Sequence, residues 1–187
     1  MNTIQITPEI WGPPCWIFLH SLSLTYNDKY KYDYFNLIKT LIYILPCYEC
    51  INHLKLYLIK YKLNQHKISK KYLEKFFIKL HNNINKKLNK KKIKYDDALK
   101  LIKHKYYTNN KKILTFFIII NYFYLTQHLS LFHFNKIKNF YKILGNIYPD
   151  KIIRKKIKNI IDTEEFKNIT NEQDLNDMCK LLFINLC

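Results

Sequence analysis

The sequence predicts an all-α protein, from its composition and from its few glycine and proline residues. Of its 187 residues, 48% are hydrophobic, which is enough to build a buried core. Glycine occurs only as Gly12 and Gly145, and residues 47–144 contain neither glycine nor proline. Turn-rich β architectures need such residues, so helices are favoured. The same shortage excludes the glycine-rich phosphate loops of Rossmann and P-loop enzymes.

The first two helices are predicted from proline and acidic start signals. Proline suits a first helical turn, so we expect a helix that begins at Pro13 and Pro14 and continues past His20 to Ser23. Asp33 can cap a second helix, which Pro46 would interrupt. The apolar positions of this second helix recur at three- and four-residue spacing: Phe35, Leu37, Ile38, Leu41, Ile42 and Leu45.

Three further helices follow from the same kinds of signal. We expect the third helix to begin at Pro46, and Ser69 offers an N-cap for the fourth. Asp96 and Asp97 are acids that suit a helix N-terminus, so they predict the start of a short fifth helix. The fourth helix has its own apolar spacing: Leu73, Phe76, Phe77, Leu80, Ile84 and Leu88.

The second half of the chain differs in composition. Polar residues at 108–112 resemble a linker, so we expect two units, residues 1–108 and a helical extension at 109–187. Between Lys112 and Lys136 lie 23 uncharged residues, long enough on paper to cross a bilayer. Asn121 and His128 are among the polar residues that interrupt this run. Because polar groups are costly in hydrocarbon, we expect a buried helix and no membrane span.

The chain is strongly basic. It carries 32 Lys and Arg against 14 Asp and Glu, a formal net charge of +18. Such a charge attracts nucleic acid or other acidic partners. Arg154 is the only arginine, however, and sequence-reading DNA binders depend on bidentate arginine contacts. We therefore interpret most of the lysines as solvated helix faces, with nucleic-acid binding as an alternative.

The C-x-x-C segment Cys47–Cys50 is the clearest candidate for chemistry. At the start of a helix, exposed N–H groups and the helix dipole stabilise a thiolate, which favours a redox disulfide. Two inert buried thiols are one alternative. A metal site with His53 is another, although structural zinc prefers four ligands and no second C-x-x-C is present.

Aromatic and polar residues at helical spacing suggest a planar ligand. Trp16 and His20 are four residues apart, as are His81 and Asn85, so each pair shares a helix face. A flavin needs stacking faces, polar contacts for its ring edges and positive charge near its pyrophosphate. Nearby lysines could supply that charge: Lys86, Lys87 and Lys90.

Three ordered blocks resemble the Erv/ALR sulfhydryl oxidases, most closely the versions found in large cytoplasmic DNA viruses. The blocks are WGPPCWIFLH at 11–20, LPCYECINH at 45–53 and LHNNINKKLNK at 80–90, and the likeness covers residues 8–105. The resemblance implies a four-helix bundle with a short fifth helix and FAD held noncovalently at its mouth. It also implies a homodimer that oxidises protein dithiols and reduces oxygen to hydrogen peroxide.

The resemblance assigns roles by position. Cys50 corresponds to the flavin-proximal cysteine and Cys47 to its interchange partner, while no metal is implied. Pro13 stands where cellular members often have arginine, and Phe76 where many have tryptophan. The remaining matches resemble FAD contacts: Gly12, Trp16, His20, His53, His81, Asn82, Asn85, Lys87 and Lys90.

The other cysteines are interpreted more cautiously. Cys179 and Cys187 could form a shuttle pair, but eight residues on a helix span about 12 Å. A disulfide needs Cα atoms within about 7 Å, so we favour two separate thiols. Residues 176–186 have the apolar spacing of a helix. Cys15 is expected to be an inert core residue.

The N-terminal residues predict where the protein acts, and the basic charge leaves an alternative function open. Residues 1–9 lack the basic and apolar regions of a secretory signal peptide, so we expect an intracellular protein, in host cytoplasm or virion if viral. The rival to the oxidase is a basic helical interaction module that binds nucleic acid or a virion component.

Overall fold

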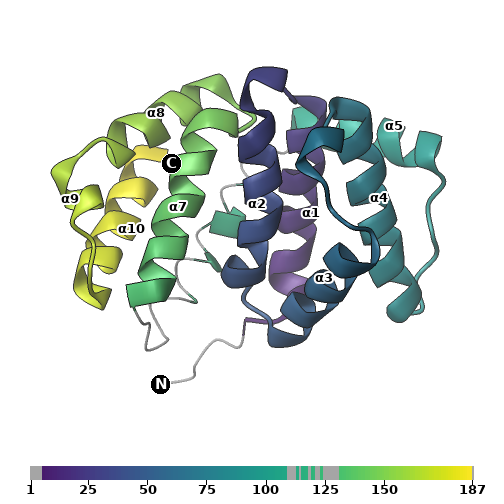
Figure 1. Ribbon diagram of the computed structural model, residues 1–187, viewed down its shortest axis with the longest axis horizontal. Helices are drawn as coiled ribbons and strands as arrows, with labels where there is room; N and C mark the ends of the chain where they lie inside the picture. Colours follow the sequence, from purple (N-terminus) through teal and green to yellow (C-terminus); the bar gives the residue numbers. More distant parts are fainter. Residues whose placement is uncertain are drawn as a thin grey trace.

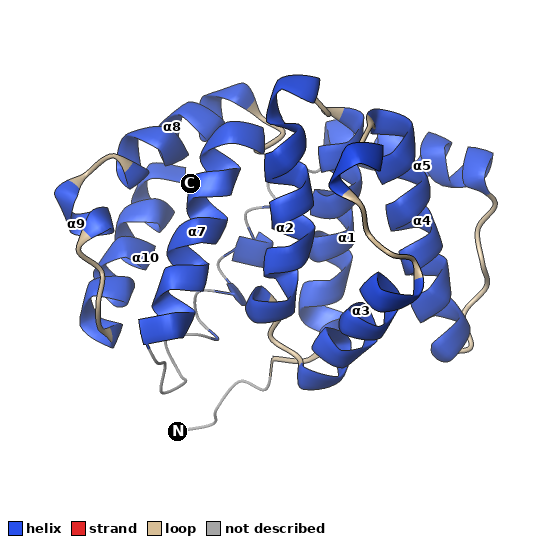
Figure 2. Cartoon of the chain, in the orientation of Figure 1, coloured by secondary structure: helices blue, strands red, loops and turns tan. Residues whose placement is uncertain are grey.

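The computed structural model describes residues 6–108, 113, 115–117, 119–120, 123 and 131–186. Within these residues the chain forms helices and no strand, which confirms the all-α prediction (Figure 2). The helices lie side by side in a long row, with α1 and α2 in the middle (Figure 1). The bounds are α1 Pro8–Leu24, η1 Asp28–Tyr30, α2 Lys31–Ile44, α3 Tyr48–Lys60, η2 Gln65–Lys67, α4 Lys70–Lys87, α5 Tyr95–Thr108, α7 Leu131–Ile147, α8 Lys151–Ile161, α9 Glu164–Lys167 and α10 Glu172–Leu186.

Helix α1 begins earlier than predicted. Pro8 occupies the first turn, after Thr7 as N-cap, so Pro13 and Pro14 lie inside the helix and do not start it. Neither of these two prolines has an N–H to give to the carbonyl one turn before it. Pro8 is the better start signal because its missing N–H would be unpaired in a first turn anyway.

The predicted role of Asp33 as N-cap of α2 is wrong. Asn27 caps the short helix η1, and α2 follows directly, so Asp33 falls in the first turn of α2. Its carboxylate accepts a hydrogen bond of 3.1 Å from Asn146 Nδ2 on α7. The acid therefore contributes to contact between distant helices, and α2 ends at Ile44, just before Pro46.

Helices α3, α4 and α5 begin close to where the sequence predicts. Cys47 is the N-cap of α3, one residue after the expected start at Pro46. Ser69 caps α4 by accepting a hydrogen bond from the Tyr72 N–H. Asp96 and Asp97 lie in the first turn of α5, where their charge is favourable.

The C-terminal helices join the rest of the bundle through α7, which packs against α2. The closest helix partner of α2 is α7, and α8 and α10 extend the row beyond it. Gly145 of α7 lies where α8 approaches, and a Cβ there would meet Ile161 Cδ1 at 2.9 Å. This glycine allows the two helices to pack closely.

Both halves of the chain share one hydrophobic cluster. Phe18 of α1 is fully buried and contacts the rings of Phe116, Phe117 and Tyr148. The described residues between Lys112 and α7 are helical, and four are buried: Ile113, Phe116, Phe117 and Ile120. No helix among the described residues is long and apolar enough to cross a membrane. The division of the chain at residue 108 stays a prediction.

Candidate active site

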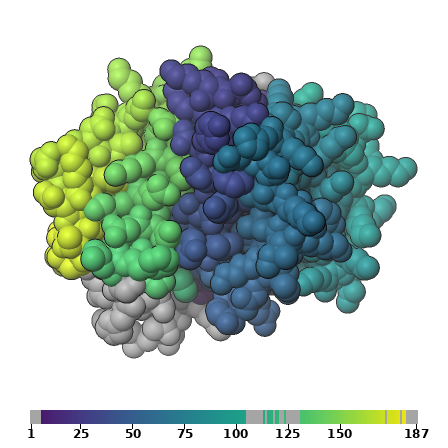
Figure 3. Space-filling view, in the orientation of Figure 1, coloured from purple at the N-terminus to yellow at the C-terminus, as the bar shows by residue number. Residues whose placement is uncertain are grey.

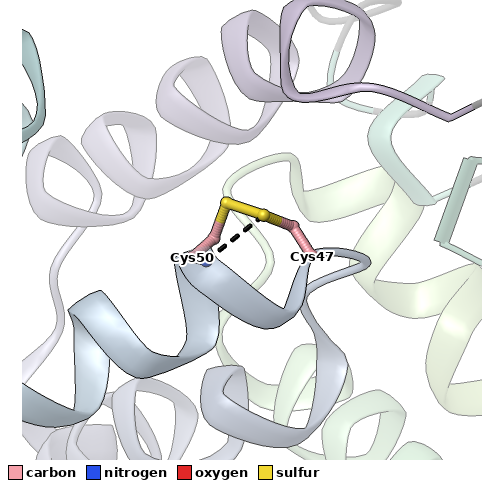
Figure 4. Close-up of a disulfide and its surroundings, with 2 residues drawn as sticks. All are labelled: Cys47 and Cys50. Atoms are coloured by element: carbon pink, nitrogen blue, oxygen red, sulfur yellow. Dashed lines mark hydrogen bonds between the residues drawn. A yellow bond between two sulfur atoms is a disulfide. The ribbon is translucent and has the colours of Figure 1, made fainter.

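The two cysteines of the C-x-x-C segment are joined at the start of α3. Cys47 and Cys50 form a disulfide with their Cα atoms 5.2 Å apart (Figure 4). Cys47 Sγ also accepts a hydrogen bond of 3.2 Å from the Cys50 backbone N–H. A sulfur at a helix N-cap lies beside exposed N–H groups and the positive end of the helix dipole, which together stabilise a thiolate.

The disulfide faces a cavity of about 750 Å³ formed by α1, α3, α4, α5 and the segment after α4. Every residue that the family resemblance assigns to the site lines this cavity, whereas Lys86, the third lysine suggested for the pyrophosphate, does not. The assigned residues are Gly12, Trp16, His20, Cys47, Cys50, His53, His81, Asn82, Asn85, Lys87 and Lys90. Their individual roles stay predictions.

Aromatic rings from α1 and α4 form one wall of the cavity. Trp16 and His81 are stacked, with ring centroids 4.1 Å apart and planes within 3°. His20 Nε2 lies 3.2 Å from His81 Nδ1, at hydrogen-bond distance. Because His20 also packs against Phe77, the position of this ring is fixed from two sides.

Two asparagines hold the segment that follows α4. The Asn82 side chain donates to the Ile93 carbonyl at 2.8 Å and accepts from the Ile93 N–H at 3.0 Å. Asn85 Nδ2 donates to the Lys91 carbonyl at 3.4 Å. The side-chain amide of Asn82 therefore pairs with both backbone polar groups of Ile93, as the backbone of a neighbouring β-strand would. This pair of hydrogen bonds fixes residues 88–93 beside the cavity.

Positive charge in the cavity comes from this part of the chain. Lys87 ends α4, and Lys90 follows in the segment that Asn82 holds. Glu9 also lines the cavity, and its pKa lies below its ordinary value. A hydrogen bond with the Thr7 side chain is the largest cause, and Lys90 makes a smaller contribution.

The cavity fits the flavin that the sequence blocks imply. Its volume is within the range of about 300–1,000 Å³ that is typical of small-molecule sites. It offers stacking rings, two lysines for a pyrophosphate and a cysteine pair in the wall. These are the contacts that a redox cofactor with an aromatic ring and phosphates requires.

Sequence reasoning missed the apolar wall that α5 contributes. Ala98, Leu101 and Ile102 line the cavity. Their spacing of three and four residues places them on one helix face, and that pattern could have identified them.

Cys15 and Phe76, which the sequence also singled out, have structural roles. Cys15 also lines the cavity, but it is buried and has no disulfide partner, and burial raises the pKa of its thiol. Phe76 lies outside the cavity and packs against Tyr57 and Tyr72. The side chain of Cys179, in α10, and the whole of Cys187 lie outside the described residues.

A helical bundle that sets a cysteine pair against a cavity with stacking rings has the architecture of a thiol–disulfide redox protein with an aromatic cofactor. Residues 13–107 match the Erv1/Alr family, and the chain belongs to that family.

Relatives in three viruses are named FAD-linked sulfhydryl oxidases. The protein of Invertebrate iridescent virus 3 is 33% identical over 91 residues, which cover 46% of this chain and 62% of that protein. The protein of Acanthamoeba polyphaga mimivirus is 30% identical over 119 residues, covering 61% and 83%. The African swine fever virus protein is 34% identical over 91 residues, covering 46% and 75%. No solved structure gives a significant match.

Proposed function

We propose that the protein is an FAD-linked thiol oxidase that makes disulfides in protein substrates through Cys47 and Cys50. The observation that carries this proposal is that the Cys47–Cys50 disulfide lines the same cavity as the stacked rings of Trp16 and His81. Membership of the Erv1/Alr family and the names of the viral relatives support it.

The exchange begins when a substrate thiolate attacks Cys47 Sγ. A bond forms between the substrate sulfur and Cys47, the Cys47–Cys50 bond breaks, and Cys50 leaves as a thiolate. A second substrate thiolate then attacks the substrate sulfur of this mixed disulfide. The substrate leaves as a disulfide, and Cys47 leaves as a thiolate stabilised by the Cys50 N–H.

The residues of the cavity would hold and orient the cofactor. FAD, when bound, supplies the two-electron acceptor that returns the reduced cysteine pair to the disulfide. Trp16, His20 and His81 would provide stacking faces, and Lys87 and Lys90 would neutralise phosphate charge. Asn82 would act by holding residues 88–93 in place, since its amide oxygen and nitrogen both bind the Ile93 backbone.

Four finer features are proposed from the family and its viral relatives. The electron acceptor is molecular oxygen, which is reduced to hydrogen peroxide. The protein is a homodimer that acts inside a cell, and it is encoded by a virus. Peroxide detection during dithiol turnover tests the first feature, and sedimentation tests the second.

An absorption spectrum tests the main proposal most directly. We expect the purified protein to be yellow, to absorb near 450 nm and to consume oxygen when a small dithiol is added. A colourless protein that binds nucleic acid would instead support the basic interaction module. Because flavin binding and dithiol oxidation are separate measurements, a yellow protein without oxidase activity would contradict only the catalytic part.

A further inference from the structure

The outer face of α3 exposes large apolar side chains to an unusual extent. Among the described residues, Tyr48, Ile59 and Leu56 are 78%, 73% and 64% exposed. Of the other large apolar side chains that the structure describes, only Ile152 on α8, 72% exposed, lies in the same range. The helix that carries the cysteine pair therefore also carries the main group of uncovered apolar side chains.

These side chains form one stripe along α3. At 100° per residue, Tyr48, Leu56 and Ile59 project within about 80° of one another and extend over about 16 Å of helix. Cys50 lies on the opposite face with the buried residues Leu54 and Tyr57. Figure 3 shows α3 on the face of the molecule toward the viewer. We call Tyr48, Leu56 and Ile59 the α3 stripe.

Positive charge surrounds the α3 stripe. Lys55 lies on the same face, and Lys60 and Lys62 lie at the C-terminal end of the helix, all of them exposed. Glu49 is the single acid in α3. A partner that covers this surface should therefore combine apolar and acidic side chains, because uncompensated like charges weaken association.

The α3 stripe begins at Tyr48, the residue next to the reactive Cys47. A mixed disulfide holds the Cα atom of the substrate cysteine within about 7 Å of Cys47 Cα. Tyr48 is the next residue and is mostly exposed, so its ring is accessible to substrate backbone beside the reacting cysteine. From there, the stripe leads along the helix away from the disulfide.

We propose that the α3 stripe is the docking surface for the polypeptide substrate, and that it selects flexible segments with apolar and acidic residues beside the reacting thiols. The proposal rests on the proposed thiol oxidase function. A flexible segment is the occupant that fits, because the stripe is narrow and convex and an extended chain can pass from Cys47 around the start of α3 and along the stripe to Ile59. Small dithiols reach Cys47 without touching Leu56 or Ile59.

The test compares a double variant, Leu56→Gln and Ile59→Gln, with the parent protein. Glutamine preserves side-chain length and helix propensity while it removes the apolar surface. Ile152→Gln on α8 is the matched control for Ile59→Gln, with nearly the same exposure and the same change of side chain. The substrates are dithiothreitol and two synthetic peptides that each carry one Cys-x-x-Cys dithiol between leucine and charged residues. The charged residues are glutamates in the first peptide and lysines in the second.

We expect kcat/KM for the glutamate peptide to fall about tenfold in the double variant, because two apolar contacts are lost. Oxidation of dithiothreitol should be unchanged, and Ile152→Gln should match the parent on every substrate. The parent should also prefer the glutamate peptide to the lysine peptide. Equal kcat/KM for the glutamate peptide in the parent and the double variant would overturn the proposal.

Two further measurements separate the docking surface from the oxidase activity. Fluorescence anisotropy with a labelled glutamate peptide, its cysteines replaced by serine, reports binding alone, and the double variant should bind it about tenfold more weakly. If the parent protein fails to oxidise dithiothreitol, the proposed oxidase function is wrong. The peptide-binding measurement still tests whether the α3 stripe is a docking surface. If sedimentation shows that the double variant changes only self-association, the stripe is a contact between copies and the docking proposal is wrong.

Discussion

The position of Cys47 at the N-cap of α3 gives the two cysteines unequal surroundings. The Cys50 N–H donates to Cys47 Sγ, so a thiolate released on Cys47 is stabilised by a hydrogen bond and by the helix dipole. Cys50 lies one turn further along, on the inner face of the helix with Leu54. This asymmetry suits Cys47 as the sulfur exchanged with substrate and Cys50 as the sulfur nearer the cofactor.

Serine substitutions test these two roles. Cys47→Ser and Cys50→Ser should each abolish thiol oxidation, because each removes one sulfur of the exchange, while folding and flavin content persist. Cys47→Ser should also leave a Cys50 thiolate beside the flavin, visible as a long-wavelength absorption band. Oxygen consumption and absorption spectra are the measurements. Cys15→Ala, in the same cavity, is the control and should remain active. Oxidase activity in Cys50→Ser would contradict the assignment.

Asn82 is expected to act on flavin affinity through the backbone that it holds. Asn82→Ala removes two hydrogen bonds to Ile93, each worth about 0.5–1.5 kcal/mol, and frees the segment that carries Lys90. We expect the Kd for FAD to rise about tenfold, measured by quenching of flavin fluorescence. Asn83→Ala in the same helical turn is the control. Equal weakening by both substitutions would show that the loss is one of helix stability.

The sequence identifies the residues of the site but not the way in which they act. Spacing alone places Trp16 with His20, and His81 with Asn85, on shared helix faces, and all four line the cavity. The bond between the Asn82 side chain and Ile93 joins residues 11 positions apart across an irregular segment. No periodic pattern predicts that contact, because it depends on the path of residues 88–93.

At the scale of the helices, a polar contact joins α2, α7 and α8. Asn146 donates to the Asp33 carboxylate, and the Asn146 carbonyl accepts from Arg154 at 3.3 Å. Partial burial raises the pKa of Asp33, and the hydrogen bond from Asn146 opposes that shift without cancelling it. The carboxylate is therefore less favourable in the folded protein than in the unfolded chain at neutral pH.

The raised pKa of Asp33 predicts a pH-dependent effect of Asp33→Asn. A carboxyl whose pKa is raised by folding favours the folded state below its unfolded pKa of 3.8, and this contribution is lost as pH rises through the folded pKa. The stability of Asp33→Asn relative to the parent should therefore increase as pH rises from about 3 to 7. Thermal unfolding at several pH values measures this difference. A relative stability that falls over that range would mean that Asn146 and the N-terminus of α2 stabilise the carboxylate more than burial destabilises it.

Helix starts could be predicted where a cap acts locally and not where the choice depends on distant packing. The Ser69 side chain caps α4 by accepting a hydrogen bond from the N–H of Tyr72, three residues later. Both residues belong to one short sequence pattern, so this pattern is enough to predict the start of the helix. Asp33 has the right side chain for a cap, but η1 begins the helix earlier and Asn146 binds the carboxylate. The difference depends on α7, which is more than 100 positions away in the chain.

At the scale of the whole molecule, the cavity and the hydrophobic core are built from different parts of the chain. Among the residues that the structure describes, those that line the cavity lie between Pro8 and Ile102. The core, in contrast, continues into the extension, since Trp11 and Phe18 of α1 pack against Phe116. The site therefore lies before the predicted boundary at residue 108, while part of the support for α1 comes from residues after it.

A truncation after residue 108 tests this division. We expect the fragment to bind FAD and to oxidise a small dithiol, because the lining residues are all retained. It should unfold at lower temperature than the full chain, since the faces of α1 and α2 that pack against Phe116, Phe117 and α7 become exposed. The loss should exceed the cost of about 3–5 kcal/mol for emptying a single phenylalanine site.

The full-length variant Phe117→Ala provides the matched comparison. It removes one buried ring of the extension and should lower stability by about 3–5 kcal/mol without changing the Kd for FAD. Denaturant unfolding and flavin fluorescence measure the two quantities separately. If the fragment unfolds at a lower temperature but binds FAD as tightly as the full chain, the extension stabilises the core and has no effect on the cofactor site. If both the fragment and Phe117→Ala lose FAD while they remain folded, the packing against α1 also sets the geometry of Trp16 and His20, and the functional boundary cannot lie at residue 108.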